Sequence, residues 1–411
     1  MKKKLIGTAI VICVVIAFGC TAAFATGLGD LISGKKKGSV TISQEEYDEL
    51  IRISEKYSKL EEVYEYIDAY FYVEPDYDKM MEYAVRGMLA GLDDNYTFYY
   101  NTEEWNEMQE DDKGEYGGIG LQLLANYTDY TVTVTRVFKN TPAEAAGVRK
   151  GDLLIRVEDI SVDPTTLDSA VNTMRGYTDT TVNIEVVRNG EHLVFDIPRA
   201  IININRVEYT MLDSDVGYLI LYQFTTGCDA EVEKALNELR AQGAKSLILD
   251  LRDNPGGVVE TARSIADIFL DRELLIYAED RDGNKENYFT KAGKDDIPLI
   301  VLVNGNSASS SEILAGGLQD LGRAKIVGTQ SYGKGIMQYV IPLSGEDGDG
   351  FQFTCAQYFT STGKAVHKIG ITPDLVVEQP EDQINEYFEL GDLTDTQLKA
   401  AWELAVTMKE D

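Results

Sequence analysis

The stretch "IPLIVLVNGNSASSSEILAGGLQDLGRAKIVG", residues 297–328, decides the fold of this chain. It begins with an uninterrupted apolar run at 299–303, passes through small and polar residues, and changes to helical spacing over 311–321 before a second apolar segment. Short apolar runs bounded by Gly and Asn are typical of buried strands. The stretch therefore predicts a strand–helix–strand unit, and with it an α/β fold.

The same alternation continues through the chain from residue 200 to 378. "VGYLILYQF", "KSLILDLRDNPGG" and "RAKIVGTQSYGKG" each carry an apolar strand into a polar, Gly-rich turn, and helices are expected over 229–241 and 258–270. We expect a layered α/β core over 200–378 and a helical segment over 379–411. Catalytic groups of such folds gather beyond the carboxyl ends of the strands, where these turns lie.

A β-rich segment precedes this core, over about residues 114–199. "YTVTVTRVF" and "TVNIEVVRNGEHLVFDIP" alternate apolar and polar residues, which predicts short strands. "TPAEAAGVRKGDLLIRV" resembles the PDZ family, in which Pro-Ala, Ala-Gly and Gly-Asp pairs precede a strand. Gly117, Gly118, Ile119 and Gly120 stand where that family has its carboxylate-binding loop. Consecutive glycines let backbone N–H groups converge on an anion, and the next strand can pair with a peptide.

The N-terminus has the features of an export signal. Residues 1–25 contain three lysines, an uncharged run and Ala-Phe-Ala at 23–25, a pattern that signal peptidases cleave. The run is also long enough for a retained membrane anchor, and Cys20 stands in a poor lipoprotein site, so three fates remain open. We expect an extracytoplasmic protein of the cell envelope, with membrane anchoring left open. Residues 26–42 are rich in Gly, Lys and Ser, which predicts a linker.

Helices are expected over much of residues 43–113. Ser43 and Glu46 form a capping box, and a second helix is expected from Tyr77 to Leu92, before the turn "GLDDNYT". Apolar residues follow the cap with spacings of three and four: Leu50, Ile53, Tyr57, Leu60, Tyr64, Ile67 and Phe71. This heptad seam fits equally a helix packed on its own domain and a coiled coil that forms a homodimer.

Composition excludes several classes of function. The chain has 411 residues and a formal net charge of −31, so phosphate groups are repelled and nucleic acid is not an expected partner. The histidines are His192 and His367, both expected to be exposed, so a Ser-His-Asp triad has no well-placed base. We expect no metal and no other cofactor, because neither an H-E-x-x-H helix nor a complete calcium loop occurs. Outside the leader, Cys228 and Cys355 leave one disulfide open.

Lys334 lies in "VGTQSYGKGIMQ", residues 327–338, which contains two misleading patterns. Gly333 and Lys334 end the G-x-x-x-x-G-K spacing of a phosphate-binding loop, but Gly335 follows where Ser or Thr is needed to bind magnesium. Ser331 and Lys334 match S-x-x-K, although glycines flank the lysine and no S-D-N accompanies it. Neither nucleotide binding nor penicillin recognition is favoured.

A serine paired with a lysine remains as the catalytic hypothesis. The turn after strand 299–303 presents hydroxyls and unpaired helix N-terminal N–H groups to one point, which suits an oxyanion. Ser309 and Glu312 also form S-x-x-E, so the pattern alone favours a helix cap as the role of Ser309. Other serines of the same turn compete for a functional role: Ser307, Ser310 and Ser311.

The stretch "SASSSEILAGGLQDLGRAKIVGTQSYGKGIMQ" resembles the carboxyl-terminal processing peptidases, also called tail-specific proteases. In that family the middle serine of S-A-S-x-S-E is the nucleophile, and a lysine base and a glutamine follow at fixed spacing. Lys334 follows Ser309 by 25 residues and Gln338 follows Lys334 by four, so all three positions match. The resemblance implies a serine endopeptidase with a crotonase-like core, and makes capping a minor role of Ser309.

The resemblance also implies how these groups would act. A lysine with its ordinary pKa of about 10.4 keeps its proton near neutrality, so Lys334 is expected to be desolvated before it takes the Ser309 proton. Gln338 is expected to face the same side, four residues along a strand, and to orient the amine. The N–H groups expected to hold the oxyanion come from Ser310 and from either Gly256 or Gly257.

We expect protein or peptide substrates with free C-termini, recognised by the PDZ-like domain. In the family this domain can hold the protease inactive until a tail binds, and Arg175 is a candidate link to Gln338. Two other classes of function stay open. A non-catalytic PDZ scaffold would keep an inactive protease fold, and acyl transfer on coenzyme A thioesters would use a similar layered core.

Overall fold

The computed structural model describes residues 41–408, apart from 114, 127–129, 139, 179, 204–205, 292, 294, 344–347, 381–382 and 384–387. The expected export signal, membrane anchor and most of the linker lie outside this range. The chain divides into two compact units after Met88. Within the described residues, no helix is long and apolar enough to cross a membrane.

The first unit contains α3 (Gln44–Tyr70) and most of α4 (Tyr77–Ala90). The predicted capping box is confirmed: Glu46 Oε2 accepts the Ser43 N–H at 2.8 Å, and Ser43 Oγ accepts the Glu46 N–H at 3.1 Å. No residue of α3 is buried, and four residues of its heptad seam are exposed among the described residues: Tyr57, Leu60, Tyr64 and Phe71. The homodimer hypothesis therefore stays a prediction.

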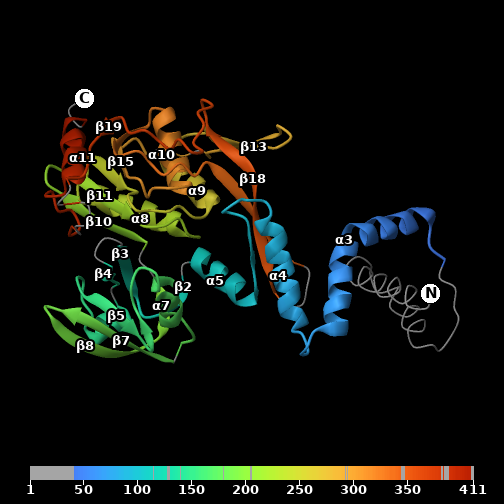
Figure 1. The fold of residues 1–411 in the computed structure, drawn as a ribbon. Helices are drawn as coiled ribbons and strands as arrows, with labels where there is room; N and C mark the ends of the chain where they lie inside the picture. Colours follow the sequence, from blue (N-terminus) through green and yellow to red (C-terminus); the bar gives the residue numbers. More distant parts are fainter. Residues whose placement is uncertain are drawn as a thin grey trace. The chain divides into compact units, whose positions relative to one another are not determined.

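A mostly parallel sheet forms the core of the second unit, which confirms the predicted α/β fold (Figure 1). Its strands follow the order β10 (Val207–Leu212), β11 (Val216–Leu221), β12 (Ser246–Asp250), β15 (Leu299–Val303), β16 (Ala324–Gly328) and β19 (Leu375–Val376). Only the β10–β11 pair is antiparallel among these neighbours. Every residue of β12 and β15 is buried, which is typical of parallel strands covered on both faces.

Helices cover both faces of this sheet, because alternate residues of each strand point to opposite sides. On one face Leu247 and Val301 belong to the core that includes α8 (Cys228–Ala241), α9 (Val259–Phe269) and α10 (Ser310–Asp320). On the other face Ile248 and Ile300 pack with α11 (Thr396–Thr407). The helices predicted over 229–241, 258–270 and 311–321 are confirmed.

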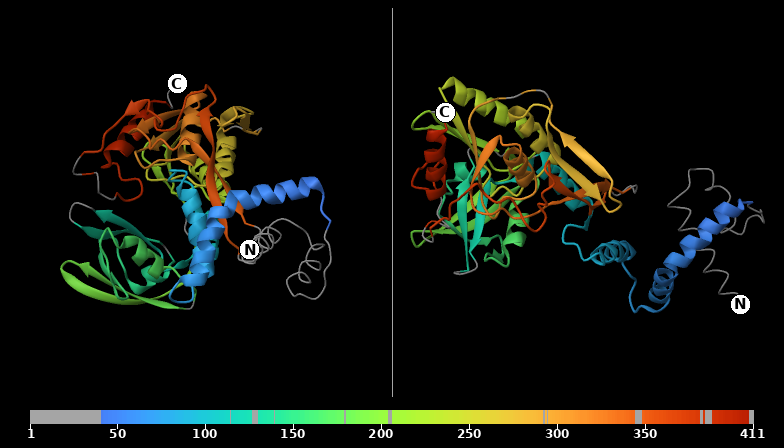
Figure 2. Two further views of the ribbon diagram at one scale, coloured as in Figure 1. Left: turned by 45° about the vertical axis from the view of Figure 1, so that its right-hand side comes forward. Right: turned by 90° about the horizontal axis from the view of Figure 1, so that it is seen from above.

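A second sheet is built around the long strand β18 (Gly350–Thr360), which is drawn in orange in Figure 2. This strand pairs with three other strands. The sheet consists of β18 with β1 (Phe98–Tyr100), β13 (Leu274–Asp280) and β17 (Ile336–Pro342), and β14 (Lys285–Phe289) pairs with β13. The β1 pairing brings a segment of the expected N-terminal helical region against the core, with Phe98 opposite Gln352. The turn that precedes β1 therefore runs beside Thr354, whose N–H donates to Thr97 Oγ1 at 3.1 Å.

The PDZ-like segment has its own sheet and its own buried core. It follows α5 (Thr102–Lys113) and contains β2 (Glu115–Gly118), β3 (Leu121–Asn126), β4 (Thr131–Val137), α6 (Pro142–Ala146), β5 (Leu153–Val157), β6 (Ile160–Ser161), α7 (Leu167–Met174), β7 (Thr181–Arg188) and β8 (Glu191–Pro198). The short strands predicted for this segment are confirmed. The strand that leads into this segment, β2, pairs with the strand that follows it, β9 (Ala200–Asn203). The chain therefore enters and leaves the segment through neighbouring strands.

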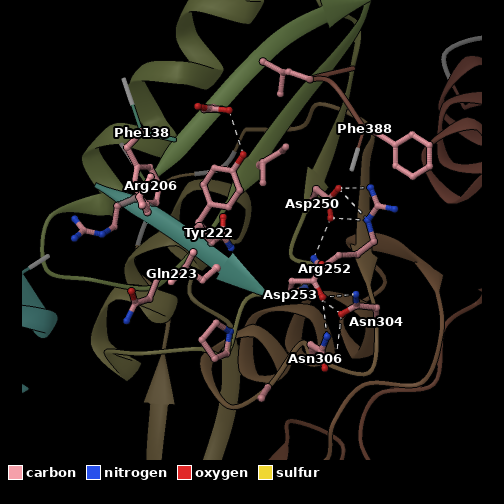
Figure 3. A pocket seen from close by; sticks show the side chains of 18 of the residues that line it. Phe138, Arg206, Tyr222, Gln223, Asp250, Arg252, Asp253, Asn304, Asn306 and Phe388 are labelled. Atoms are coloured by element: carbon pink, nitrogen blue, oxygen red, sulfur yellow. Dashed lines mark hydrogen bonds and ion pairs between the residues drawn. The ribbon is translucent and has the colours of Figure 1, made fainter. Parts of the chain in front are cut away.

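A buried ionic cluster fixes α11 to the end of β12. Arg252 Nη2 lies 2.6 Å from Asp250 Oδ2 and 2.8 Å from Asp395 Oδ2, and the Tyr218 hydroxyl donates to Asp250 at 2.7 Å. Figure 3 shows the guanidinium of Arg252 facing the carboxylate of Asp250. Asp395 also caps α11, because its Oδ1 accepts the Leu398 N–H at 3.2 Å. One arginine thus balances two buried carboxylates from distant parts of the chain.

Replacement of Arg252 by alanine should strongly destabilise the fold. Two buried carboxylates would lose their common cation, and such a loss typically costs about 3–5 kcal/mol. Urea denaturation would measure the free energy of unfolding. The control is Arg281→Ala, whose side chain is 93% exposed, and it should change stability by less than about 0.5 kcal/mol. Equal stability of both variants would contradict a structural role of the cluster.

Candidate active site

Ser309 lies at the start of α10, after the turn that follows β15. Its backbone has φ 53° and ψ −115°, which non-glycine residues rarely adopt and which is common at functional sites. Neighbouring serines fix this turn: Ser307 Oγ donates to Leu251 O at 2.7 Å, and Ser311 Oγ donates to Asn254 O at 2.9 Å. The hydroxyls of two competing serines are therefore engaged in holding the backbone.

Gly256 and Gly257 lie against the same turn. A Cβ on Gly256 would lie 2.8 Å from Ser309 Cβ and 2.9 Å from Ser310 N, so no other residue type fits there. The Gly256 N–H already donates to Asn254 Oδ1 at 2.9 Å, whereas Gly257 O accepts the Ser310 hydroxyl at 2.8 Å. The predicted oxyanion residues are thus brought together, but the N–H of Gly256 is used within its own turn.

Lys334 lies in the loop between β16 and β17, not in a strand, because β17 begins two residues later. Gly335 is needed in this loop, since a Cβ there would lie 2.1 Å from His367 N. Lys334 and Gln338 therefore do not lie on one strand, and the expectation that they share one face of a strand is wrong. A register shift at the start of β17 breaks the alternation further.

The buried carboxylate of Glu312 joins the serine turn to the lysine loop. Its Oε2 accepts the N–H of Ser309 at 2.9 Å and the N–H of Lys334 at 2.8 Å. Its Oε1 accepts the Ser331 hydroxyl and the Gly333 N–H, both at 2.6 Å. Glu312 is 1% exposed, and a buried carboxylate is tolerated where several donors satisfy it. The glutamate expected in a helix cap therefore also holds the second loop.

Tyr358 of β18 joins the same two loops from another side. Its hydroxyl lies 3.2 Å from Ser309 O and 2.8 Å from Lys334 O. Burial, together with the charge of Glu312, raises the pKa of Tyr358 well above its ordinary value. The hydroxyl consequently stays protonated, and its single proton is shared between these two carbonyls, with the shorter contact to Lys334 O. The side chain of Tyr358 therefore bridges the backbones of Ser309 and Lys334.

The Lys334 amine lies in a partly desolvated environment. Its Nζ lies 4.6 Å from the centroid of the Tyr96 ring. Burial lowers the pKa of Lys334 below its ordinary value, although the charges of Asp94 and Glu312 oppose this shift. A hydrogen bond to Tyr332, with burial, raises the pKa of Tyr96 to about 12, so Tyr96 remains neutral. The direction of the Lys334 shift agrees with the expected desolvation and favours an amine that can accept a proton.

Gln338 lies in β17, opposite Thr354 of β18. Its Nε2 donates to Thr354 Oγ1 at 3.3 Å, and Thr354 Oγ1 donates in turn to Asp94 Oδ2 at 2.6 Å. Asp94 is also one of the charges that act on Lys334. The third predicted residue is thus connected to the surroundings of the lysine through a threonine and an aspartate.

The predicted carboxylate-binding loop precedes the edge strand β3 of the PDZ-like sheet. Gly120 has φ 90°, and a Cβ there would lie 2.4 Å from Thr141, so glycine is required. Gly117 is held by the Gly176 N–H, which donates to Gly117 O at 3.0 Å. An edge strand beside an N–H-rich loop can accept a peptide as an added strand.

A cavity of about 1360 Å³ is lined both by this loop and by the lysine loop. On the PDZ-like side it includes Gly118, Ile119 and Gly120, together with Arg175 at the C-terminal end of α7. On the core side it includes Lys334. Its core wall also contains the turns after β12 and β15, where Asp253 faces Asn304 and Asn306 (Figure 3).

The two histidines differ in exposure, and the two cysteines of the described residues are not bonded to each other. His192 is exposed as expected, with Nδ1 2.7 Å from Glu185 Oε1. The expectation of an exposed His367 is wrong, because the lysine loop packs against its backbone and leaves it half-buried. Cys228 is buried, Cys355 is half-buried, and both are free thiols, so the disulfide left open by the sequence is not formed.

Sequence reasoning missed three residues of this site. Tyr358 lies in an ordinary apolar strand pattern, which contains no signal for a bridging hydroxyl. Asp94 was visible in the turn "GLDDNYT", but only the pairing of β1 with β18 places it beside Thr354. Glu312 could have been found, because a glutamate three residues after a candidate nucleophile lies in the first turn of the same helix.

Glu312→Gln should loosen both loops. Glutamine offers one carbonyl oxygen in place of two and turns an NH₂ group toward backbone N–H donors, so we expect about 2–4 kcal/mol lower unfolding free energy. Amide hydrogen exchange at Gly333 and Lys334 should become faster. Glu233→Gln on the exposed side of α8 is the control and should change neither quantity. Unaltered exchange in the lysine loop would show that Glu312 does not hold it.

Comparison with known proteins identifies the family to which the chain is similar. Residues 215–377 match the model of peptidase family S41, residues 117–198 match a PDZ domain, and residues 17–104 match the N-terminal domain of the activating protease CtpB. The carboxy-terminal-processing protease of Bartonella bacilliformis is 37% identical, over 83% of this chain and 78% of its own length. The carboxy-terminal processing protease CtpA of Bacillus subtilis is 31% identical, over 93% and 79%.

A solved structure leads to the same family. The photosystem II D1 C-terminal processing protease is 30% identical, with a TM-score of 0.54, and the match covers 78% of this chain and 86% of that protein. A putative S41 protease from Bacteroides fragilis, at 15% identity and a TM-score of 0.56, shares the fold. The chain therefore belongs to the carboxyl-terminal processing proteases of peptidase family S41, which are serine-type peptidases, and it carries a PDZ domain.

Proposed function

We propose that this protein is an exported or membrane-anchored serine endopeptidase that cuts peptide bonds with a dyad of Ser309 and Lys334. The observation that carries the proposal is the double link between the two loops, made by the Glu312 carboxylate and the Tyr358 hydroxyl. Export rests on the pattern of residues 1–25. On the same basis we propose that the protein is located outside the cytoplasm.

The reaction begins with proton transfer from Ser309 to Lys334. Neutral Lys334 accepts the Oγ proton as Oγ forms a bond to the peptide carbonyl carbon. The charge that develops on the carbonyl oxygen is held by the N–H groups of Ser310 and Gly257, since the N–H of Gly256 is already given to Asn254. Lys334 then returns the proton to the leaving amine as the C–N bond breaks, and water later hydrolyses the acyl-enzyme.

Recognition of the substrate is assigned to the PDZ domain. The N–H groups of the loop formed by Gly117, Gly118, Ile119 and Gly120 bind the C-terminal carboxylate of a protein or peptide, and β3 pairs with its last residues. The cavity that this loop shares with Lys334 supports the assignment. Arg175 lines the same cavity and is proposed to transmit tail binding to the catalytic residues.

The dyad is tested by Ser309→Ala and Lys334→Ala in the full-length chain, with an unstructured peptide as substrate. Each variant should lose at least about 1000-fold in kcat/KM, because the nucleophile or its base is removed. Ser58→Ala and Lys399→Ala, both exposed, are the matched controls and should keep full activity.

The same assay also tests tail recognition. A substrate with a free C-terminus should be cut with about tenfold higher kcat/KM than its amidated form, because a charged acceptor is lost on amidation. If the wild type binds the free tail but never cuts it, the peptidase proposal is wrong and the protein is a non-catalytic scaffold.

Arg175→Ala should remove the stimulation of turnover by an added, uncleaved peptide tail while the fold stays intact. Stimulation is measured as the ratio of kcat/KM with and without the tail, and the fold by thermal melting. Arg149→Ala, an exposed arginine of the same domain, should leave the ratio unchanged. A normal ratio in the Arg175 variant would remove this residue from the mechanism.

A further inference from the structure

Asp94 accepts hydrogen bonds from two threonine hydroxyls close to Gln338. Its Oδ2 accepts from Thr97 Oγ1 and from Thr354 Oγ1, both at 2.6 Å, and its Oδ1 accepts the Tyr96 N–H at 3.2 Å. Burial alone raises the pKa of Asp94, but these hydrogen bonds and the nearby His367 more than offset it. The net pKa is lowered, so Asp94 is an ionised acceptor near neutrality.

The charge on Asp94 gives the hydrogen-bond chain a direction. A hydroxyl has a single proton, and Thr354 donates its proton to the carboxylate, which can only accept. The Thr354 oxygen can then only accept from Gln338, which fits the contact with Nε2 at 3.3 Å. Thr97 cannot reverse this order, because its proton also goes to Asp94 while its oxygen accepts the Thr354 N–H.

We propose that Asp94 and Thr354 are positioning residues that fix which end of the Gln338 side-chain amide faces the Lys334 amine. With its NH₂ group directed to Thr354, Gln338 turns Oε1 away from that contact, where it can accept a hydrogen bond from the amine. A reversed amide would instead donate an N–H to the lone pair of the neutral amine, which the amine needs to accept the Ser309 proton. The inference rests on the proposed function of Gln338 in orienting the lysine.

Thr354→Val in the full-length chain tests the chain of hydrogen bonds, because valine keeps the shape and removes the hydroxyl. We expect kcat to fall about tenfold with KM within about twofold, since the amide acts on the reacting amine and not on substrate binding. Thr354→Ser keeps the hydroxyl and should restore kcat to within about threefold of the wild type.

A matched control lies on the same strand. Thr360 of β18 is buried, and its hydroxyl accepts the Lys364 N–H at 3.2 Å, but it makes no hydrogen bond to Gln338 among the described residues. Thr360→Val should therefore leave kcat unchanged. Thermal melting of all variants separates loss of activity from loss of fold.

The decisive comparison is made in a Gln338→Ala background. If Thr354 acts through Gln338, adding Thr354→Val to Gln338→Ala lowers kcat no further. Losses that multiply in the double variant, or full activity of Thr354→Val alone, would overturn the inference and leave the dyad untouched. Full activity of Gln338→Ala would instead remove Gln338 from the proposed function, and the positioning role with it.

Asp94→Asn adds a readout that depends on charge. Asparagine can donate as well as accept, so the direction of the chain is lost and kcat should fall as in Thr354→Val. The groups that act on the Lys334 amine are Asp94, Glu312 and the ring of Tyr96. Because the Asp94 charge raises the pKa of Lys334, its removal should shift the acid limb of the kcat/KM profile to lower pH. Thr354→Val should not shift it, and equal profiles in both variants would contradict the assignment to Asp94.

Discussion

The carboxylate of Glu312 is the constraint on which the site depends. It is almost fully buried, and it accepts hydrogen bonds from both loops that carry the proposed dyad. An unpaired buried carboxylate costs several kcal/mol, so the fold is stable only while the donors stay in place. This requirement ties the backbone of Ser309 to that of Lys334 whatever their side chains do. Tyr358 adds a neutral hydroxyl that contacts the carbonyls of the same two residues.

The same carboxylate creates a conflict that the surroundings of Lys334 have to resolve. Glu312 and Asp94 both favour the charged amine, and so does the face of the Tyr96 ring. Burial acts in the opposite direction and has the larger effect, so the pKa is lowered overall. The hydrogen bonds that occupy Glu312 spread its charge over backbone N–H groups. Desolvation can therefore dominate even with two acids close by.

Much of the fold was predictable from local pattern. The capping box at Ser43 and the buried strands around the stretch 297–328 follow from short-range spacing, and the structure has them as expected. The argument from strand alternation failed at Lys334, because β17 begins only at Ile336 and a register shift follows between Met337 and Gln338. His367 was misjudged for a similar reason, since its half-burial comes from a loop that is distant in sequence.

The sequence by itself determined the order of strands and helices, the PDZ-like insertion and the spacing of Ser309, Lys334 and Gln338, because each is written in residues close together in the chain. Only the tertiary structure decided which groups surround them. Asp94 reaches Thr354 because β1 pairs with β18 across most of the chain length, and no local periodicity encodes such a pairing. The N–H of Gly256 is likewise used within its own turn, by Asn254, which becomes apparent only when the folded backbone assigns a partner to each donor.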